Sequence, residues 1–284
     1  MNWLDEGSLY SQISSFLRED LGRGDITSQA IIARNTRARG RFVAGEKMIV
    51  AGLEAAEEVF LSLDPQLQLE AFVSDGEEIE AGKVIARVVG FADVLLSGER
   101  VALNLLQRLS AIATLTNEFV QAVAGTGVAI IDSRETTPGL RMLERYAVLL
   151  GGGLNNHFGL DDSVVITGNH VALFGSMATA VKSAREKLGL LHKIKVQVSN
   201  ENEMREALGA KADVLQLEGL TPEETARLVS IARELANGVS IECSGDITPA
   251  NVRNYAEAGV DMISISTLTN SARGLDISFK MQPA

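Results

Sequence analysis

The chain has 284 residues, of which 46% are apolar and 22% charged, and its formal net charge at pH 7 is -11. This length and apolar content exclude a disordered chain and allow one large domain or two smaller ones. The acidic balance and the aromatic content of 5% argue against nucleic-acid binding, which needs a basic face and rings for stacking. We therefore expect a small-molecule ligand as the partner.

Targeting and redox signals predict a soluble cytoplasmic protein. No apolar run approaches the roughly 20 residues that a membrane helix needs, so we expect no membrane partner. The residues from Met1 to Glu6 lack the basic flank and apolar core of a signal peptide. Cys243 is the only cysteine, which excludes an intrachain disulfide and zinc sites built from several cysteines. Its place in an apolar strand is more typical of packing than of a nucleophile.

The first 97 residues have a mixed pattern that predicts a small α/β domain. A short amphipathic helix over 9–17 leads into the turn-rich segment 20–28, which ends in helix-cap chemistry. Strands are expected at 40–44, 48–51, 67–73 and 83–89, and a helix at 53–63.

From Gly98 the pattern changes to a long helix over 100–123, followed by short apolar strands that alternate with helices. The expected strands are 128–132, 164–167, 193–198, 214–217, 239–242 and 262–266, and the expected helices are 141–150, 172–187, 201–208, 222–235 and 249–258. This alternation implies a parallel sheet. Its continuous repetition favours a barrel over a doubly wound sheet, although periodicity alone leaves both open.

Polar residues or glycine follow nearly every one of these strands, at the end where a barrel holds its ligand. The strand ends are 132–135, 167–170, Gln197, 218–219, 244–246 and 264–266. Serine and glycine gather at the last two, which fits backbone amides around a phosphate, although such turns are also common in loops.

Several long motifs occur in order along the chain: 19–28, 99–108, 110–114, 132–141 (DSRETTPGLR), 151–153, 259–264 and 275–278. On these motifs the chain resembles the quinolinate phosphoribosyltransferases, the carboxylating nicotinate-nucleotide pyrophosphorylases. The resemblance implies an N-terminal α/β sandwich domain (1–97), an open α/β barrel of the type II phosphoribosyltransferase kind with the ligand site (98–272), and a tail that returns to the N-terminal domain (273–284). It also implies a homodimer in which Arg100 reaches the partner's site.

The family joins quinolinate to phosphoribosyl pyrophosphate with Mg²⁺ and releases carbon dioxide to give nicotinate mononucleotide. This sequence departs from the family's pattern at many site positions. In each case the residue of this chain replaces a different residue of the family. Glu135 replaces a lysine, Asn156 and His157 a His-Arg pair, Thr167 and Gly168 a Lys-Asp pair, Gln197 a glutamate, Glu218 an aspartate, Gly219 an asparagine, Asp246 a glycine and Asn270 a histidine. Together these changes make the cleft about three charge units more negative than the family's basic cage. They predict a heterocycle less anionic than quinolinate.

The candidate residues follow from the strand ends and the resemblance. Those for substrate are Arg100, Arg134, Glu135, Asn156, His157, Thr167, Gln197 and Glu218, and those for phosphate are Ser244, Gly245, Ser264 and Ser266. We assign no catalytic residue and expect no dedicated metal site, while Mg²⁺ with a phosphoribosyl pyrophosphate-like donor is implied by the resemblance. Structural alternatives are an ion pair of Arg134 with Glu144 or Glu242, a dimer-supporting role for Arg100, and local hydrogen bonding by His157 and His170.

Three hypotheses about function remain open at this point. The chain is a pentosyltransferase with altered specificity, an ordinary quinolinate phosphoribosyltransferase of NAD biosynthesis, or a non-catalytic dimeric paralogue with a binding or regulatory role. The loss of paired basic residues favours the first and third over the second.

Overall fold

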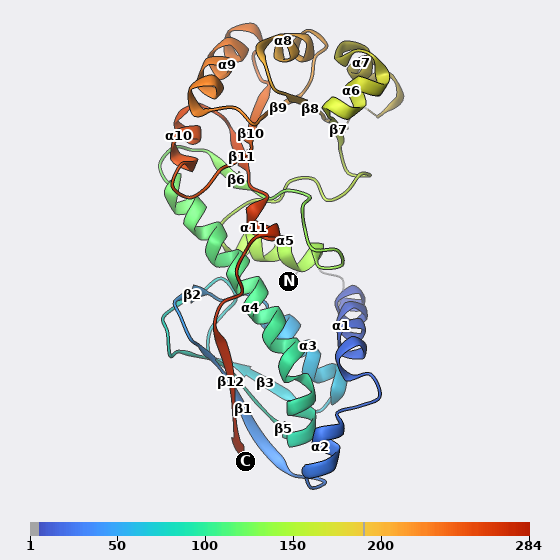
Figure 1. Cartoon of the computed structure of the whole chain (residues 1–284), viewed down its shortest axis with the longest axis vertical. Coiled ribbons are helices and arrows are strands. Elements are labelled where there is room, and N and C mark those ends of the chain that lie inside the picture. The colour runs from blue at the N-terminus through green and yellow to red at the C-terminus, as the bar shows by residue number, and fades with distance from the viewer. Residues whose placement is uncertain (1–5, 190) are drawn as a thin grey trace. The chain divides into compact units, whose positions relative to one another are not determined.

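The computed structural model describes residues 6–189 and 191–284 (Figure 1). The expectation that no signal peptide is present rests largely on Met1 to Asp5, which lie outside these residues. No helix in the described ranges has the length and apolar character needed to cross a membrane. The chain divides into two compact units: unit 1 comprises Met1–Leu115, Thr136–Gly152 and Thr269–Ala284, and unit 2 comprises Thr116–Glu135 and Gly153–Leu268.

Unit 1 is built on a four-stranded antiparallel sheet with the strand order β12-β1-β5-β3. The strands are β1 (Arg37–Ala44), β3 (Gln68–Ala71), β5 (Val84–Phe91) and β12 (Ile277–Pro283), and β2 (Met48–Ile49) pairs separately with β4 (Glu78–Ile79). The rings of Phe42, Phe60 and Phe279 pack together with centroids 4.6 to 6.2 Å apart. Gly40 allows this packing, because a Cβ there would collide with the Phe279 ring.

The helices of unit 1 are α1 (Glu6–Leu21), α2 (Ile26–Ile31), α3 (Leu53–Leu63), α5 (Arg141–Leu150) and most of α4 (Ala92–Ala122). Helix α2 starts where the Asp25 carboxylate accepts hydrogen bonds from the backbone N–H groups of Thr27 and Ser28, which is the cap chemistry expected there. Helix α4 begins at Ala92 rather than Arg100, so the expected domain boundary after residue 97 falls inside it. The short α11 (Thr267–Asn270) follows the last strand of unit 2.

Unit 2 contains a six-stranded parallel sheet with the order β6-β11-β10-β9-β8-β7. The strands are β6 (Ala129–Ile131), β7 (Val164–Ile166), β8 (Ile194–Val198), β9 (Val214–Glu218), β10 (Ser240–Ser244) and β11 (Met262–Ser264). A parallel bridge between Ile131 and Leu154 extends the β6 edge. The strands curve inside an outer layer of helices (Figure 1), which confirms the expected open α/β barrel.

The outer helices are α6 (Gly168–Phe174), α7 (Met177–Lys187), α8 (Glu201–Gly209), α9 (Pro222–Leu235) and α10 (Val252–Glu257). The single helix expected over 172–187 was wrong. Gly175, at φ 94°, ends α6, and the Ser176 side chain caps α7. Helix α9 has the expected capped start, since Thr221 and Glu224 exchange side-chain and backbone hydrogen bonds.

Candidate functional site

The inner face of the unit 2 sheet is polar. Along β9, Leu215 and Leu217 are buried while Gln216 and Glu218, in the opposite phase, are partly accessible. The register pairs Gln216 with both Gln197 and Glu242. Because paired residues of neighbouring strands point to the same side, one face collects the polar side chains. They are Lys195, Gln197, Gln216, Glu218, Glu242, Ser244 and Ser264.

At the carboxyl edge of this face, three side chains form a hydrogen-bonded chain. The Gln216 Nε2 donates to Ser244 Oγ at 2.9 Å, and the Ser244 hydroxyl donates to the Glu218 carboxylate. Gln197 and Glu218 also line a cavity of about 410 Å³ together with Gly168. The structure therefore brings together three of the predicted site residues, Gln197, Glu218 and Ser244, where barrel proteins bind their ligands.

The turn after β10 approaches the turn after β9 closely. Gly245 has φ 142°, and a Cβ there would lie 3.3 Å from the backbone of Gly219. Glycine is therefore required at this close approach. The Ser264 side chain is buried, with its Oγ 3.5 Å from the carbonyl oxygen of Cys243, whereas Ser266 is half-buried beyond β11.

The buried Cys243 lies on the helix side of β10. Its burial raises the pKa of the thiol to about 12, and the nearby Glu242 carboxylate acts in the same direction. The thiol is protonated at neutral pH, so Cys243 contributes to packing and does not supply a nucleophilic thiolate.

Arg134 and Glu135 are exposed in the loop after β6, where the Glu135 N–H donates to Ser133 Oγ at 3.1 Å. The two carboxylates considered as partners of Arg134 have other cations beside them. Glu144 pairs with Arg108 at 2.8 Å. Glu242 pairs with Lys195 at 2.9 Å. Arg100 is exposed on α4 in unit 1.

Thr167 and His170 interact with each other at the start of α6. The Thr167 N–H donates to His170 Nδ1 at 3.1 Å, and the threonine hydroxyl lies 2.8 Å from the same nitrogen. This pair satisfies backbone and side-chain groups at the helix start. Both side chains therefore have a local structural role in addition to any contact with a ligand.

A second polar network lies deeper on the inner face. Lys195 Nζ donates to Glu242 Oε2 at 2.9 Å and to Asn156 Oδ1 at 3.2 Å. The Asn156 N–H donates to the Asp132 carboxylate at 2.7 Å, and His157 Nδ1 lies 3.2 Å from Asn156 Oδ1. Lys195 is 7% exposed, Glu242 1% and Asp132 0%. Two predicted residues, Asn156 and His157, thus belong to a network centred on a buried ion pair.

Sequence reasoning missed Lys195 and Glu242 as site residues, because it considered only the strand ends. The available signal was alternation: in the strand from Ile194 to Val198, Lys195 and Gln197 occupy the same phase. A lysine in an otherwise apolar strand needs a buried counter-ion, and Glu242 is in the same phase on β10.

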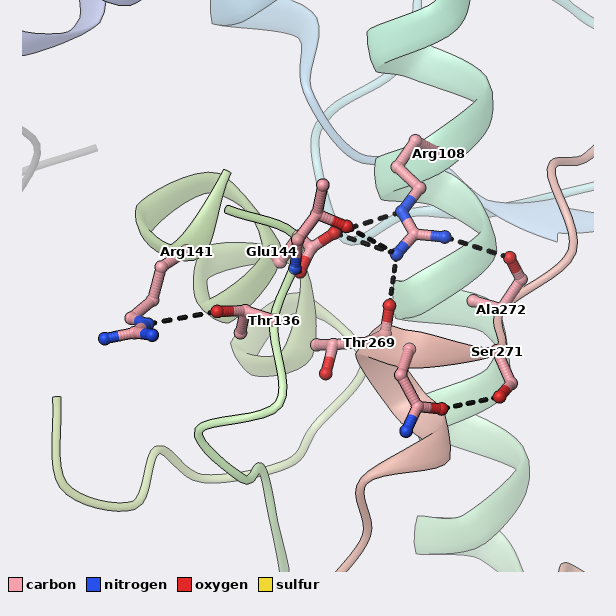
Figure 2. A network of polar contacts seen from close by, with 9 residues as sticks. Arg108, Thr136, Arg141, Glu144, Thr269, Ser271 and Ala272 are labelled. Carbon is pink, nitrogen blue, oxygen red and sulfur yellow. Dashed lines mark hydrogen bonds and ion pairs between the residues drawn. The ribbon is translucent and has the colours of Figure 1, made fainter. Parts of the chain in front are cut away.

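Within unit 1, Arg108 of α4 and Glu144 of α5 form an ion pair beside the later part of the DSRETTPGLR motif, residues 136–141 (Figure 2). Arg108 donates through Nε and Nη2 to Glu144 Oε1 at 3.1 and 2.8 Å, and through Nη1 to the Ala272 carbonyl oxygen at 3.1 Å. Its Nη2 also donates to the Thr269 carbonyl oxygen. Glu144 Oε2 accepts from the Thr137 N–H at 3.0 Å. Every atom of this pair that can form a hydrogen bond has a partner within unit 1.

Neither unit contains, among its described residues, a group of three or more His, Cys, Asp or Glu side chains that could hold a metal ion. An open α/β barrel with carboxylate, amide and hydroxyl groups at its strand ends, next to a cavity, is a small-molecule binding architecture of the kind used by barrel enzymes.

Comparisons with known proteins place the chain within this class. The model of the quinolinate phosphoribosyl transferase N-terminal domain matches residues 25–110, and that of the C-terminal domain matches residues 112–280. The chain therefore belongs to the quinolinate phosphoribosyltransferase family, which confirms the resemblance seen in its motifs.

Individual relatives agree with this assignment. The chain is 42% identical to a probable carboxylating nicotinate-nucleotide pyrophosphorylase of Bacillus subtilis, over 94% of this chain and 91% of the relative. It is 38% identical to the corresponding probable enzyme of Synechocystis, over 95% and 91%. The solved nicotinate-nucleotide pyrophosphorylase of Francisella tularensis superposes with a TM-score of 0.92 at 33% identity, covering 99% of this chain and 98% of that one.

Proposed function

We propose that this protein is a quinolinate phosphoribosyltransferase that forms nicotinate mononucleotide for NAD biosynthesis. In this reaction the quinolinate ring nitrogen displaces pyrophosphate from phosphoribosyl pyrophosphate, and the 2-carboxylate leaves as carbon dioxide. The observation that carries the proposal is the match to both family domains, with relatives at 38% and 42% identity that bear this activity in their names. This extent of similarity favours the ordinary activity over the altered specificity expected from single positions.

The carboxyl edge of the unit 2 sheet is the proposed place for the phosphoribosyl donor. Gln197 and Glu218 line its cavity, and Ser244 and Gly245 form the adjacent turn. Arg134, exposed after β6, is the proposed cation for an acceptor carboxylate. Mg²⁺ in such sites is held by one or two carboxylates plus substrate phosphates. Glu218 fits the carboxylate role, and the rest of the coordination would come from the donor.

A second candidate function is phosphoribosyl transfer to a heterocycle less anionic than quinolinate. The observation that favours it is the Ser244 hydroxyl, which donates to Glu218 and so places a carboxylate beside the proposed phosphate turn. A like charge next to a phosphate or carboxylate ligand weakens binding. Glu135, in the loop that carries Arg134, has the same sign.

Incubation of the purified protein with quinolinate, phosphoribosyl pyrophosphate and Mg²⁺ tests the first proposal. We expect nicotinate mononucleotide at a rate of about 1 s⁻¹ or more, the usual range for enzymes. An Arg134→Met variant should lose this activity, whereas Lys182→Met, on the exposed side of α7, should retain it. Turnover of nicotinate or nicotinamide but not quinolinate would support the second candidate. Absence of turnover with all three would support a non-catalytic paralogue.

We also propose that the active form is a homodimer in which Arg100 completes the partner's site. Support comes from its exposure on α4, where it forms no hydrogen bond or ion pair with the described residues. Arg100→Ala and Arg134→Met variants should each be inactive, and mixing them under exchange conditions should restore activity, because one mixed site retains both arginines. Failure of mixing to restore activity in a demonstrated mixed dimer would contradict this arrangement.

A further inference from the structure

The four-stranded sheet of unit 1 has two faces of different chemistry. On one face, the rings of Phe42 and Phe279 pack against Phe60 of α3. The side chains of the opposite phase along β1 point away from this core, and three of them are exposed arginines. They are Arg37, Arg39 and Arg41. Because they are two residues apart, successive arginines are spaced by about 7 Å along the strand.

The strand register places further cations beside these arginines. Arg41 lies opposite Lys280 of β12 on one side and Arg87 of β5 on the other. Arg87 in turn lies opposite Glu70 of β3, with which it forms an ion pair. Among the paired residues of this face Glu70 is the only acid, so five cations and one carboxylate give a formal charge of +4. The whole chain, in contrast, carries -11. We call Arg37, Arg39, Arg41, Arg87 and Lys280 the basic face.

Repulsion within the basic face opposes folding. Side chains directly opposite each other on antiparallel strands are about 5 Å apart at Cβ, and like charges at this separation destabilise a sheet. Apart from Arg87, no cation of the basic face forms an ion pair with a carboxylate of the described residues. An anionic partner lying across the face would relieve this repulsion. The free protein therefore has a charge arrangement that favours binding of such a partner.

The basic face fits the carboxylates of an extended peptide better than it fits a nucleic acid. A guanidinium binds a carboxylate through two parallel hydrogen bonds, and alternate side chains of an extended peptide are also about 7 Å apart. Nucleic acids bound on a flat sheet stack their bases on exposed rings. Here the Arg37 Cζ lies over the Phe91 ring, 5.4 Å from its centroid, and the Arg87 Cζ lies 5.8 Å from that of Phe72. Guanidinium groups thus occupy the positions where bases would stack.

We propose that the basic face binds an extended acidic segment of another protein, whose carboxylates at alternate positions pair with Arg37, Arg39 and Arg41. Recognition of acidic motifs by clustered arginines is a common mode of peptide binding. No residue of the basic face is among those proposed for the transfer reaction. Activity with quinolinate and peptide binding are separate measurements, so either proposal can fail alone.

Fluorescence anisotropy with a labelled peptide of alternating Glu and Thr, long enough to cover the eight residues of β1, tests the proposal at low ionic strength. We expect the wild-type protein to bind it about tenfold or more tightly than the same peptide with Gln in place of Glu. A peptide of the same composition in the order Glu-Glu-Thr-Thr presents Thr to every second arginine. It should bind about threefold or more weakly than the alternating peptide.

A double variant tests whether the peptide binds at this face. Arg39→Gln with Arg41→Gln changes two exposed side chains and should weaken binding of the alternating peptide about fivefold or more. The matched control is Arg205→Gln with Arg227→Gln, which removes the same charge from α8 and α9, where both arginines pair with Glu201. Binding by the control variant should equal that of the wild-type protein.

Two other anions separate the peptide from the remaining classes of partner. An oligothymidylate of the same charge and phosphatidylserine vesicles should each bind more weakly than the alternating peptide. The proposal would be overturned by a lack of peptide binding up to about 1 mM, by equal binding of the two Glu-Thr orders, or by an equal loss in the control variant. Tighter binding of the oligonucleotide or of the vesicles would overturn it as well.

Discussion

Each unit contains an ion pair with a buried carboxylate, and the two pairs differ in how completely they are hydrogen-bonded. In unit 1, Arg108 of α4 and Glu144 of α5 bond to each other, Arg108 also donates to the carbonyl oxygens of Thr269 and Ala272, and Glu144 also accepts from the Thr137 N–H (Figure 2). In unit 2, Lys195 and Glu242 leave one oxygen without a partner, next to a cavity. Because the hydrogen-bonding atoms of Arg108 and Glu144 all have protein partners, we expect this pair to stabilise the loop over 136–141 and not to bind a ligand.

The largest expected effect is on the saturated pair. Arg108→Met should lower the free energy of unfolding by about 3–5 kcal/mol, because Glu144 would remain fully buried without a counter-ion. Chemical denaturation measures this change. Arg87→Met, which breaks an exposed pair with Glu70, is the control and should cost about 1 kcal/mol or less. A loss from Arg108→Met as small as that of the control would contradict a stabilising role for the Arg108–Glu144 pair.

The incomplete pair should be less sensitive to the same kind of change. Lys195→Met should lower the free energy of unfolding by about 1–3 kcal/mol, because the space left by the ammonium group would let water from the adjacent cavity reach Glu242. The measurement is again chemical denaturation, with Lys182→Met on exposed α7 as the control. A loss equal to that of Arg108→Met would mean that the cavity gives Glu242 no access to water.

A hydrogen bond from a neutral phenol to a carboxylate in unit 1 should matter less than either ion pair. Tyr146 donates to the Asp75 carboxylate at 3.0 Å, and the same carboxylate accepts from the Leu53 N–H at 3.1 Å. Burial raises the pKa of Tyr146, so the phenol remains a donor at neutral pH. Tyr146→Phe should cost about 1 kcal/mol. Tyr10→Phe, at an exposed position, is the control and should change the free energy of unfolding little. Equal effects of the two substitutions would mean that the hydrogen bond from Tyr146 to Asp75 does not stabilise unit 1.

The smallest expected effect concerns the half-buried cap residue of α2, Asp25, and depends on pH. Hydrogen bonds from the Ser28 side chain and backbone hold the pKa of Asp25 below its usual value. Because the folded-state pKa is the lower one, this stabilisation is present above the unfolded-state value and is lost as pH falls through the folded-state value. Asp25→Ala should cost about 1 kcal/mol or less at pH 7 and almost nothing at pH 2. Thermal unfolding at both pH values measures this, and a pH-independent cost would contradict it.

Much of the fold follows from the sequence, because strand and helix periodicities differ and cap residues mark helix starts. The α3 helix has the expected bounds, and Thr221 begins α9 as expected. Helix boundaries that fall inside continuous apolar patterns were harder to predict. The start of α4 at Ala92 follows β5 directly, with no turn signal between them, and Gly175 divides what appeared to be one helix.

The candidate site was only partly predictable for a different reason. Residues at strand ends can be placed from local pattern, and Gln197, Glu218 and Ser244 do lie together. The pairing of Lys195 with Glu242 depends on the strand order β10-β9-β8, which places a strand between them. Alternation along each strand indicates that both side chains are on the inner face, but whether they meet depends on the strand order and on the curvature of the sheet.

The pairing of β12 with β1 has a consequence for how the protein is made. Seven residue pairs join the two strands in register, from Ala38 with Pro283 to Ala44 with Ile277. During translation, β1 leaves the ribosome long before β12, so one side of the unit 1 sheet stays open while the whole of unit 2 is synthesised. An open strand edge is a template for pairing with other chains. Nascent chains that stall before β12 are therefore expected to be the ones that chaperones must protect from aggregation.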